Sequence, residues 1–519
     1  MKKTQAERSR RRGADGDQAA LLASRSAAES YGRSLMKATL DHLHGAGMRR
    51  TYSGASIATL DRLFDEPLPQ QGRAPLRVLR ECREKIFRHS MSMSHPRIFG
   101  LFNPAPLPIA AFAELAAAFL NQSVDAWKAA PAGTHLEKRL IRWMNDLIGF
   151  GRPAFGVLTS GGGIANTIAL KMARDRVAGL PSRRTGLPVR LSGRLRVYAS
   201  DQAHFSITRS LDLLGLGEDA LVRIPSDADL RLSPGLLYTA IERDRTRGRV
   251  PMAVVATAGT TNTGTIDPLP EITAIARRAG VHCHVDAAYG GALLFSSRYR
   301  DRLDGIEAAD SVTVDPHKWL FQPFSLGGLF VRDGRALNAS FRTEPDYLRK
   351  DLESEPERLD FYHYSMEGSR PFRGLKFWFT LKGLGRRGLG ALVDRTMQIA
   401  FHLERRVRGD ERFEAIEAPV DLASVCFRYL PAWARPLTRA ERSRPALRER
   451  LNRLQKSIQQ EIERRGFAWF PTIVLRGEVH FRFGVFNYRT TEKDVDAVLD
   501  HIVKVAASRG GRAAPQRRR

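Results

Sequence analysis

The stretch DPHKWLFQ, from Asp315 to Gln322, follows the apolar run SVTV and places Lys318 directly behind a histidine. A lysine by itself says little, because most lysines in proteins are solvated surface charges. At the end of a buried strand, however, a lysine can act as a nucleophile that forms a Schiff base. The position of Lys318 after an apolar run therefore makes it the first candidate for a reactive group in this chain.

A second element lies upstream, in the segment VHCHVDAAYGG from Val281 to Gly291. Its apolar strand delivers Asp286 into a turn of small residues, where a ligand can approach the backbone closely. Two strand ends about thirty residues apart, one bearing aspartate and the other lysine, form the arrangement that pyridoxal 5'-phosphate (PLP) needs. The lysine forms the Schiff base, and the carboxylate keeps the pyridine nitrogen protonated so that the ring accepts electrons.

His282 and His284 alternate with Asp286 along the same strand, so the three side chains share one face. Such a set is also compatible with a metal site. The aspartate is better explained by the cofactor, and we expect no metal.

A glycine-rich turn, Thr159–Gly163, lies between the strand FGVL and a helix expected to begin near Ala165. Backbone amides and the helix dipole converge there on a position that suits a phosphate. The spacings GxGxxG and GxxxxGK[ST] of nucleotide sites are both missing. His204 follows the strand RVYAS at a helix start, and TAGTTNTGTIDPL supplies the hydroxyls of Thr260 and Thr261.

The composition is that of a globular protein of 519 residues, 43% hydrophobic and 27% charged. The longest apolar stretch, from Leu107, contains Glu114 and is too short to cross a bilayer. The basic N-terminal segment has no apolar region behind it, which argues against a secretory signal. The three cysteines have neither disulfide-framework nor CxxC spacing. We therefore expect a cytoplasmic enzyme without a membrane partner.

The net charge of +27 would attract polyanions whatever the fold. Much of it lies at the ends, since residues 1–12 hold six basic side chains and residues 509–519 hold five. Both ends have the composition of disordered tails. No zinc finger or other base-reading motif accompanies them, so we expect no specific nucleic-acid partner, although nonspecific polyanion affinity stays open.

From Phe155 onward, short apolar strands alternate with amphipathic helices, which predicts an α/β fold with a large, mostly parallel sheet. Upstream, Thr134 in the expected loop APAGTHLE is a candidate cap for a helix whose first turn contains Glu137. Asp267 and Pro268 are expected to open a helix that Gly280 closes.

The same patterns divide the chain into five parts. We expect a disordered basic tail (1–30), an N-terminal helical segment (31–100), a large cofactor-binding domain (101–390), a smaller C-terminal α+β domain (391–505) and a second basic tail (506–519).

Eight motifs occur in order between about Met91 and Val505: HPRIFG, APAGTHLE, TSGGGIAN, DQAHFS, TAGTTNTGTIDP, HVDAAYGG, DPHKW and RPFRGLKFW. In this order they resemble the group II PLP-dependent amino-acid decarboxylases, the family of aromatic-L-amino-acid, glutamate and cysteine-sulfinate decarboxylases. The resemblance implies the type I aminotransferase-like fold of PLP-dependent transferases and a homodimer. It also implies conversion of a small-molecule L-amino acid to an amine and carbon dioxide through a Schiff base on Lys318.

The resemblance also assigns site residues. Lys318 is then the Schiff-base lysine, Asp286 pairs with the pyridine nitrogen, His204 stacks on the ring and Tyr347 protonates the carbanion. The remaining cofactor contacts that the resemblance implies are Gly162 and Gly163 in the phosphate turn, Thr261, Ala288, and His317 near the phosphate.

Several questions stay open at this level. Position 315 is Asp where many relatives have Asn, and Arg373 and Arg482 are both candidates to bind a substrate carboxylate. Tyr347 favours a decarboxylase, because a phenylalanine there would point to an aldehyde synthase. Alternatives are such an aldehyde synthase, a carbon–carbon lyase of the same fold, or a basic binding protein on a degenerate enzyme scaffold. The sequence does not name the amino acid.

Overall fold

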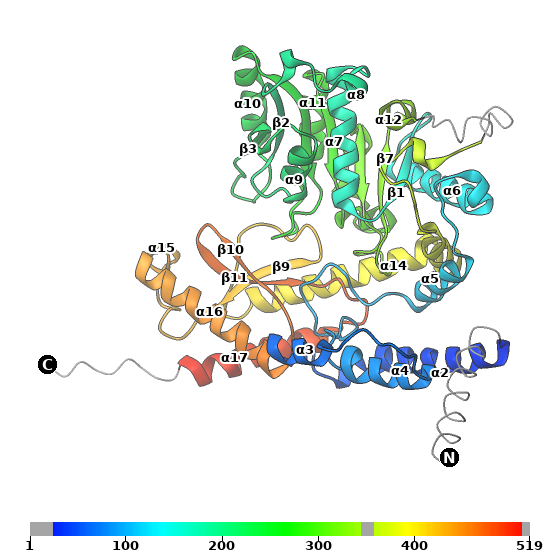
Figure 1. Ribbon diagram of the computed structural model, residues 1–519. Helices are drawn as coiled ribbons and strands as arrows, with labels where there is room; N and C mark the ends of the chain where they lie inside the picture. The colour runs from blue at the N-terminus through cyan, green and yellow to red at the C-terminus, as the bar shows by residue number, and fades with distance from the viewer. Residues whose placement is uncertain (1–23, 344–357, 511–519) are drawn as a thin grey trace.

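A computed structural model describes residues 24–343 and 358–510 of the chain (Figure 1). Its centre is a seven-stranded sheet of order β1-β7-β6-β5-β4-β2-β3. The strands are β1 (Phe155–Thr159), β2 (Leu195–Ser200), β3 (Leu221–Ile224), β4 (Val250–Thr257), β5 (His282–Asp286), β6 (Ser311–Val314) and β7 (Gly327–Val331). Only β7 runs against its neighbours, pairing antiparallel with both β1 and β6, while the other pairs are parallel. The expected α/β fold with a mostly parallel sheet is confirmed.

Helices cover both faces of this sheet, because alternate strand residues pack into different cores. Val197 and Ala199 of β2 lie in a core with residues of α7 (Gly162–Ala178) and α9 (Ser206–Leu213). Tyr198, between them, lies in the main core with residues of α10 (Pro234–Thr246) and α11 (Leu269–Arg278). The strands are thus buried on both sides, as parallel strands usually are.

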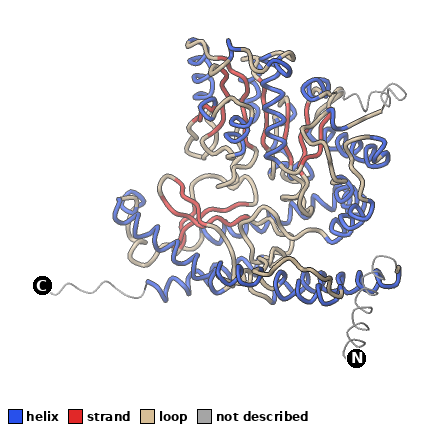
Figure 2. The backbone as a smooth tube through the Cα atoms, in the orientation of Figure 1, coloured by secondary structure: helices blue, strands red, loops and turns tan. Residues whose placement is uncertain are grey.

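A smaller antiparallel sheet of order β10-β11-β9-β8 lies below the large one in Figures 1 and 2. Its strands are β8 (Phe413–Ala415), β9 (Ser424–Tyr429), β10 (Thr472–Leu475) and β11 (Glu478–Gly484). The helices that accompany it are α14 (Gly374–Arg408), α15 (Arg439–Arg442), α16 (Pro445–Arg465) and α17 (Glu492–Gly510). Within α14, Gly385 has φ +66°, which kinks the helix.

The N-terminal helices run along the base of the molecule, beside α16 and α17 (Figure 1). They are α2 (Arg25–His44), α3 (Ile57–Phe64) and α4 (Pro75–Cys82). The next two helices, α5 (Pro108–Leu120) and α6 (Pro131–Ile148), pack against α14, which also contacts β8 and β9 of the smaller sheet. No helix among the described residues is both long and apolar enough to cross a membrane.

Some expected boundaries are wrong. Helix α2 begins at Arg25, inside the expected tail, because the Ser24 hydroxyl accepts a hydrogen bond from the Ala27 amide and caps the first turn. At the other end α17 continues to Gly510, beyond the expected domain end at residue 505. The proposed boundary at residue 390 falls inside α14.

Two helix starts also differ from expectation. Helix α6 begins at Pro131, so APAGTHLE is not a loop, and both Thr134 and Glu137 are buried inside the helix. Asp267 does not cap α11, because its carboxylate accepts the amides of Leu232 and Thr257, each at 2.7 Å. For Asp267, these two tertiary partners replace the local role that the sequence suggests, whereas the Thr134 hydroxyl is buried without a hydrogen-bond partner among the described residues.

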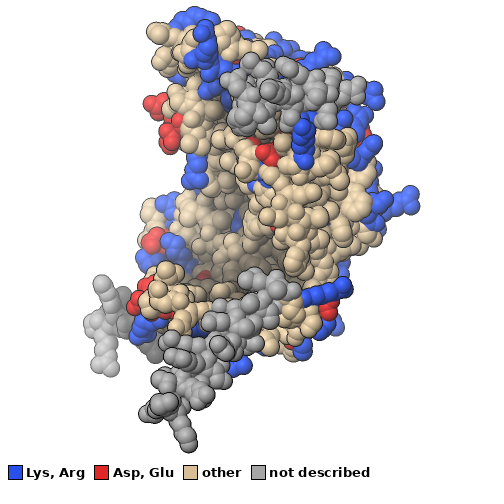
Figure 3. All heavy atoms as spheres, turned by 45° about the vertical axis from the view of Figure 1, so that its right-hand side comes forward, with Lys and Arg blue, Asp and Glu red and all other residues tan. Residues whose placement is uncertain are grey.

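On the face in Figure 3, Lys and Arg lie on the upper and the lower parts of the molecule, and the surface is hollowed between them.

Candidate active site

A cavity of about 160 Å³ lies where the carboxyl ends of the central strands meet the start of α7. Its lining residues are Phe102, Gly162, Gly163, Asn166, His204, Thr257, Gly259, Thr261, Asp286, Ala288, Tyr289 and Lys318. Of the residues proposed from sequence, the structure brings seven together here: Gly162, Gly163, His204, Thr261, Asp286, Ala288 and Lys318. His317 does not line the cavity, and Tyr347 lies outside the described residues.

Asp286 is the last residue of β5, opposite Thr257 of β4, and its side chain is buried. Its Oδ2 accepts a hydrogen bond from Asn166 Nδ2 at 2.8 Å, and its Oδ1 accepts one from the Ala288 amide at 3.1 Å. A carboxylate oxygen has two lone-pair sites, so each oxygen can still accept a second hydrogen bond. Asp286 is therefore held in place and is still able to pair with a cation in the cavity.

Asn166 is held by two donors on the far side of its amide. His284 Nε2 lies 3.0 Å from Asn166 Oδ1, and Thr313 Oγ1 donates to the same oxygen at 2.8 Å. Burial lowers the pKa of His284 to about 4, so its imidazole is neutral and can donate from one nitrogen only. Asn166 was not among the residues predicted from sequence, although it lies four residues after Gly162 and hence on the same helix face as the glycine turn.

His204 is fixed through its Nδ1 atom. That atom accepts the Ser206 amide at 3.2 Å and lies 2.8 Å from Ser206 Oγ, which itself receives a hydrogen bond from Asn166 at 3.0 Å. Burial lowers the pKa of His204, and the nearby Asp286 opposes this only partly. His204 thus presents a neutral ring to the cavity, which suits stacking on a flat ligand.

The glycine turn forms the start of α7, three residues earlier than expected. A Cβ added at Gly163 would have the Ser206 side chain, 4.0 Å away, as its nearest neighbour, so there is free space on this side of the turn. The amide of Gly162 already donates to Asp315 Oδ2 at 2.9 Å. This carboxylate, which the sequence analysis did not place in the site, also lies 3.3 Å from Lys318 Nζ.

His317 packs against the glycine turn on the side away from the cavity. Its Nδ1 accepts the Leu326 amide at 3.0 Å, and its ring packs on Phe324 with 4.4 Å between ring centres. A Cβ at Gly161 would lie 3.1 Å from its Cε1 atom, so His317 touches the backbone of the turn instead of the cavity. Burial, with the neighbouring Lys318, lowers the pKa of His317 to about 3.

The two arginines proposed to bind a substrate carboxylate both have partners. Arg373 makes two hydrogen bonds to Glu367, at 3.0 and 2.9 Å. Arg482 donates to the carbonyls of Thr261 and Gly100 and lies over the Phe102 ring at 4.9 Å. Arg482 is thus close to two lining residues, whereas Arg373 is neutralised.

The lining fits a phosphorylated pyridine aldehyde. Lys318 supplies an amine, Asp286 a carboxylate for a ring nitrogen, and the start of α7 an anion site. Thr257 Oγ1 is buried at the cavity without a hydrogen-bond partner among the described residues, which leaves one hydroxyl for a ligand. These are the groups that PLP requires.

The chain is similar to known proteins over most of its length. The pyridoxal-dependent decarboxylase conserved domain matches residues 58–430. L-2,4-Diaminobutyrate decarboxylase of Rhizobium meliloti (strain 1021) is 37% identical over 462 residues, which cover 88% of this chain and 87% of the relative. Aromatic-L-amino-acid decarboxylase of Bacillus atrophaeus is 32% identical over 472 residues, covering 90% and 93%.

The similarity extends to a solved structure. The crystal structure of Oryza sativa TDC with PLP and tryptamine has a TM-score of 0.85 and 27% identity, over 94% of this chain and 99% of that one. A match of this extent makes the chain an enzyme and not a degenerate binding scaffold. With Lys318, Asp286 and the glycine turn at one cavity, the chain belongs to the group II pyridoxal-dependent decarboxylases, carboxy-lyases that use PLP to convert L-amino acids to amines and carbon dioxide.

Proposed function

We propose that Lys318, Asp286, His204 and Tyr347 carry the decarboxylation in this protein. PLP, when bound, supplies a sink for the electrons of the bond to the substrate carboxylate. The observation that supports these roles best is that the Lys318 amine and the Asp286 carboxylate line the same cavity as the glycine turn.

Each residue has a separate task. The Lys318 amine would hold the cofactor until the substrate amine takes its place, and the Asp286 carboxylate would stabilise positive charge on a ring nitrogen. The neutral His204 ring would pack against a flat ligand. Tyr347, in the segment FRTEPDYLRK, delivers the proton that replaces the carboxylate, as the resemblance to the family implies.

A panel of L-amino acids scored for carbon dioxide and amine tests this function. L-2,4-Diaminobutyrate comes first because of the Rhizobium meliloti relative, followed by glutamate, cysteine sulfinate and aromatic amino acids. Lys318→Ala serves as the blank, and Lys382→Ala, an exposed lysine on α14, is the matched control. Borohydride is expected to trap PLP on the wild type and on Lys382→Ala, but not on Lys318→Ala.

Three results would contradict the proposal. Oxygen consumption with aldehyde formation would indicate an aldehyde synthase, and aldehyde release without carbon dioxide a carbon–carbon lyase. A purified wild-type protein that bound no PLP would overturn the assignment of the cavity.

We also propose that the protein is a homodimer in which the N-terminal helices contact the partner subunit. The described part of α3 buries no residue fully, and α4 buries only Leu79. Apolar side chains on and between these helices are exposed instead: Ile57, Phe64, Leu68, Leu76 and Val78.

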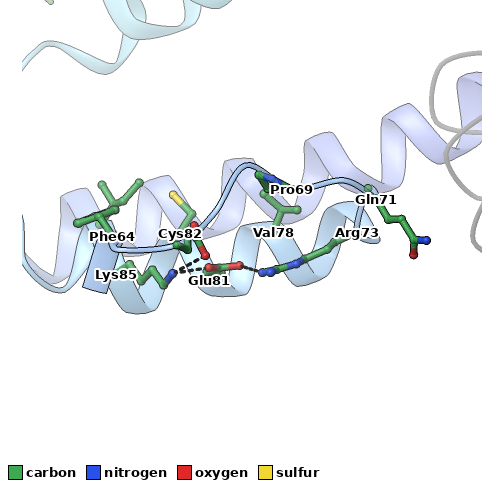
Figure 4. A pocket seen from close by; sticks show the side chains of 11 residues that line it. Phe64, Pro69, Gln71, Arg73, Val78, Glu81, Cys82 and Lys85 are labelled. Atoms are coloured by element: carbon green, nitrogen blue, oxygen red, sulfur yellow. Dashed lines mark hydrogen bonds and ion pairs between the residues drawn. The ribbon is translucent and has the colours of Figure 1, made fainter. Parts of the chain in front are cut away.

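Figure 4 shows a surface pocket between these helices, with Phe64, Pro69 and Val78 around it. The polar edge of the pocket is Glu81, which pairs with Arg73 at 2.7 Å and with Lys85 at 2.6 Å. Such a surface is typical of an interface.

Sedimentation of the full chain tests the dimer. The wild type is expected to sediment as a dimer, and a variant with Ile57→Glu, Leu68→Glu and Val78→Glu as a monomer. Leu213→Glu, Leu236→Glu and Val474→Glu together provide the control, because these exposed apolar residues lie outside the N-terminal helices and the change in charge is the same. A monomeric wild type would refute the proposal.

We propose a cytoplasmic location. Cys82, Cys283 and Cys426 are unpaired thiols, and burial raises the pKa of both Cys283 and Cys426 to about 12. Thiols kept in the reduced state fit a reducing compartment. Fractionation of the source cells checks this, and recovery of the protein from the exported fraction would contradict it.

A further inference from the structure

Asp315 is a buried carboxylate beside Lys318 that has no part in the reaction proposed above. Its side chain is 1% exposed, and its Oδ2 accepts the Gly162 amide at 2.9 Å and lies 3.3 Å from Lys318 Nζ. Its Oδ1 has no hydrogen-bond partner among the described residues. A Cβ at Gly327 would lie only 2.5 Å from that oxygen, so the carboxylate is tightly enclosed.

Three titratable groups face Asp315. Lys318 supplies a positive charge as long as its amine is protonated, and His317 Nε2 lies 3.7 Å from Oδ2. The lowered pKa of His317, about 3, keeps that ring neutral. Asp286, from the adjacent strand β5, adds a second negative charge. In the part of the chain that the structure describes, Lys318 is therefore the cation that balances Asp315.

Cofactor binding removes this balance. The Lys318 ammonium must lose a proton before its amine can react with an aldehyde. A phosphate placed at the start of α7 comes beside the carboxylate that already holds the Gly162 amide. A buried carboxylate without a cation and next to a phosphate is strongly disfavoured, and it takes up a proton instead. Burial already raises the pKa of Asp315, against the opposing effect of Lys318.

We propose that Asp315 accepts the ammonium proton of Lys318 when the cofactor binds, and then stays protonated beside the phosphate. The proton moves from Lys318 Nζ to Asp315 Oδ2, across the 3.3 Å between them. The freed amine condenses with the cofactor aldehyde, so that a C=N bond replaces the C=O bond and one water leaves. The protonated carboxyl then has an O–H group to donate to a phosphate oxygen, which an ionised carboxylate lacks. This inference rests on the proposed role of Lys318.

Difference infrared spectroscopy of the protein with and without PLP tests it. The wild type at pH 7 is expected to gain the carbonyl band of a protonated carboxylic acid on binding PLP, with a shift in D2O. The band is expected to be missing in Asp315→Asn and kept in Asp310→Asn, a partly exposed aspartate of the same region.

PLP affinity provides a second readout. Between pH 7 and pH 9 the wild type is expected to lose at least about tenfold in affinity relative to Asp315→Asn, because ionisation of Asp315 opposes binding. Wild-type protein that binds PLP on Lys318, without the carboxyl band and with the pH dependence of Asp315→Asn, would overturn this inference alone. A protein that binds no PLP would overturn the proposed function instead.

Discussion

The carboxylate of Asp286 receives one hydrogen bond on each oxygen, from Asn166 and from the Ala288 amide. These bonds fix its direction without neutralising it, so its negative charge is available to a ring nitrogen. Asp286→Asn keeps the shape and removes the charge. We expect kcat/KM for the amino acid that the panel identifies to fall about 10²–10³-fold, the usual effect of losing one such electrostatic contact.

Steady-state kinetics with saturating PLP checks this expectation. Asp310→Asn is the matched control, since Asp310 accepts the Cys283 amide at 2.8 Å but does not line the cavity. A loss smaller than about threefold in Asp286→Asn would show that the charge is not used.

Site residues that follow a strand can be predicted from the sequence, whereas site residues that act through contacts between distant segments cannot. Asp286 and Lys318 each follow an apolar run, so their positions could be predicted. Asn166 and Asp315 act through contacts between segments far apart in the chain, 120 residues apart for Asn166 and Asp286 and 153 for Asp315 and Gly162. No local pattern encodes such distances.

Strand β7 supports the glycine turn from one side. A Cβ on Gly327, its first residue, would lie 2.6 Å from Gly161 Cα and 2.5 Å from Asp315 Oδ1. Gly327→Ala must therefore move the turn or the carboxylate, at a cost of about 1–3 kcal/mol. We expect weaker PLP binding in a fluorescence titration, together with a lower melting temperature.

Gly235→Ala is the control, because a Cβ there meets no atom within 4 Å. Gly235 lies in the first turn of α10, where alanine is a good helix former. Equal PLP affinity in both variants would show that β7 does not position the turn.

The buried ion pair between Glu137 and Arg370 joins α6 to the segment that leads into α14. Both side chains are fully buried, with 3.0 Å between Arg370 Nη2 and Glu137 Oε2. Arg370 also donates to the Leu158 carbonyl at 2.8 Å, at the end of β1. Arg370→Leu leaves Glu137 buried without its cation, and we expect the free energy of unfolding to fall by about 3–5 kcal/mol.

Urea denaturation measures this change. The double variant Glu137→Leu with Arg370→Leu is expected to lose less than Arg370→Leu alone, because no isolated charge remains. A double variant less stable than Arg370→Leu would contradict the argument. The sequence around Glu137 predicts a loop and a helix cap, because a glutamate in a first turn has a common local explanation, whereas its partner Arg370 lies 233 residues away.

Among the described residues, five buried histidines make stability depend on pH. Burial lowers the pKa of His95, His282, His284 and His480 to about 4 in each case, and that of His317 to about 3. Between pH 6.5 and 4 the unfolded chain binds protons at these rings and the folded chain does not, so folding loses stability as the pH falls. Each fully buried ring contributes about 3 kcal/mol over that range.

His480→Gln tests one of these rings. We expect the free energy of unfolding, measured in urea at pH 7, 6 and 5, to fall less steeply in this variant than in the wild type. His44→Gln, at an exposed position on α2, should behave as the wild type does. A wild type equally stable at pH 7 and pH 5 would contradict the prediction.

The reversed strand β7 also sets an order of events during synthesis. Strand β1 lies at the sheet edge and pairs with β7 alone, Phe155 opposite Val331, so the ribosome must make both before this part of the sheet can close. The glycine turn follows β1 directly, yet Asp315 and Gly327 arrive only with the later strands. Contacts between such distant segments form slowly. A nascent chain is therefore unable to hold its cofactor until the large domain is almost complete, and a truncated product would be released without it.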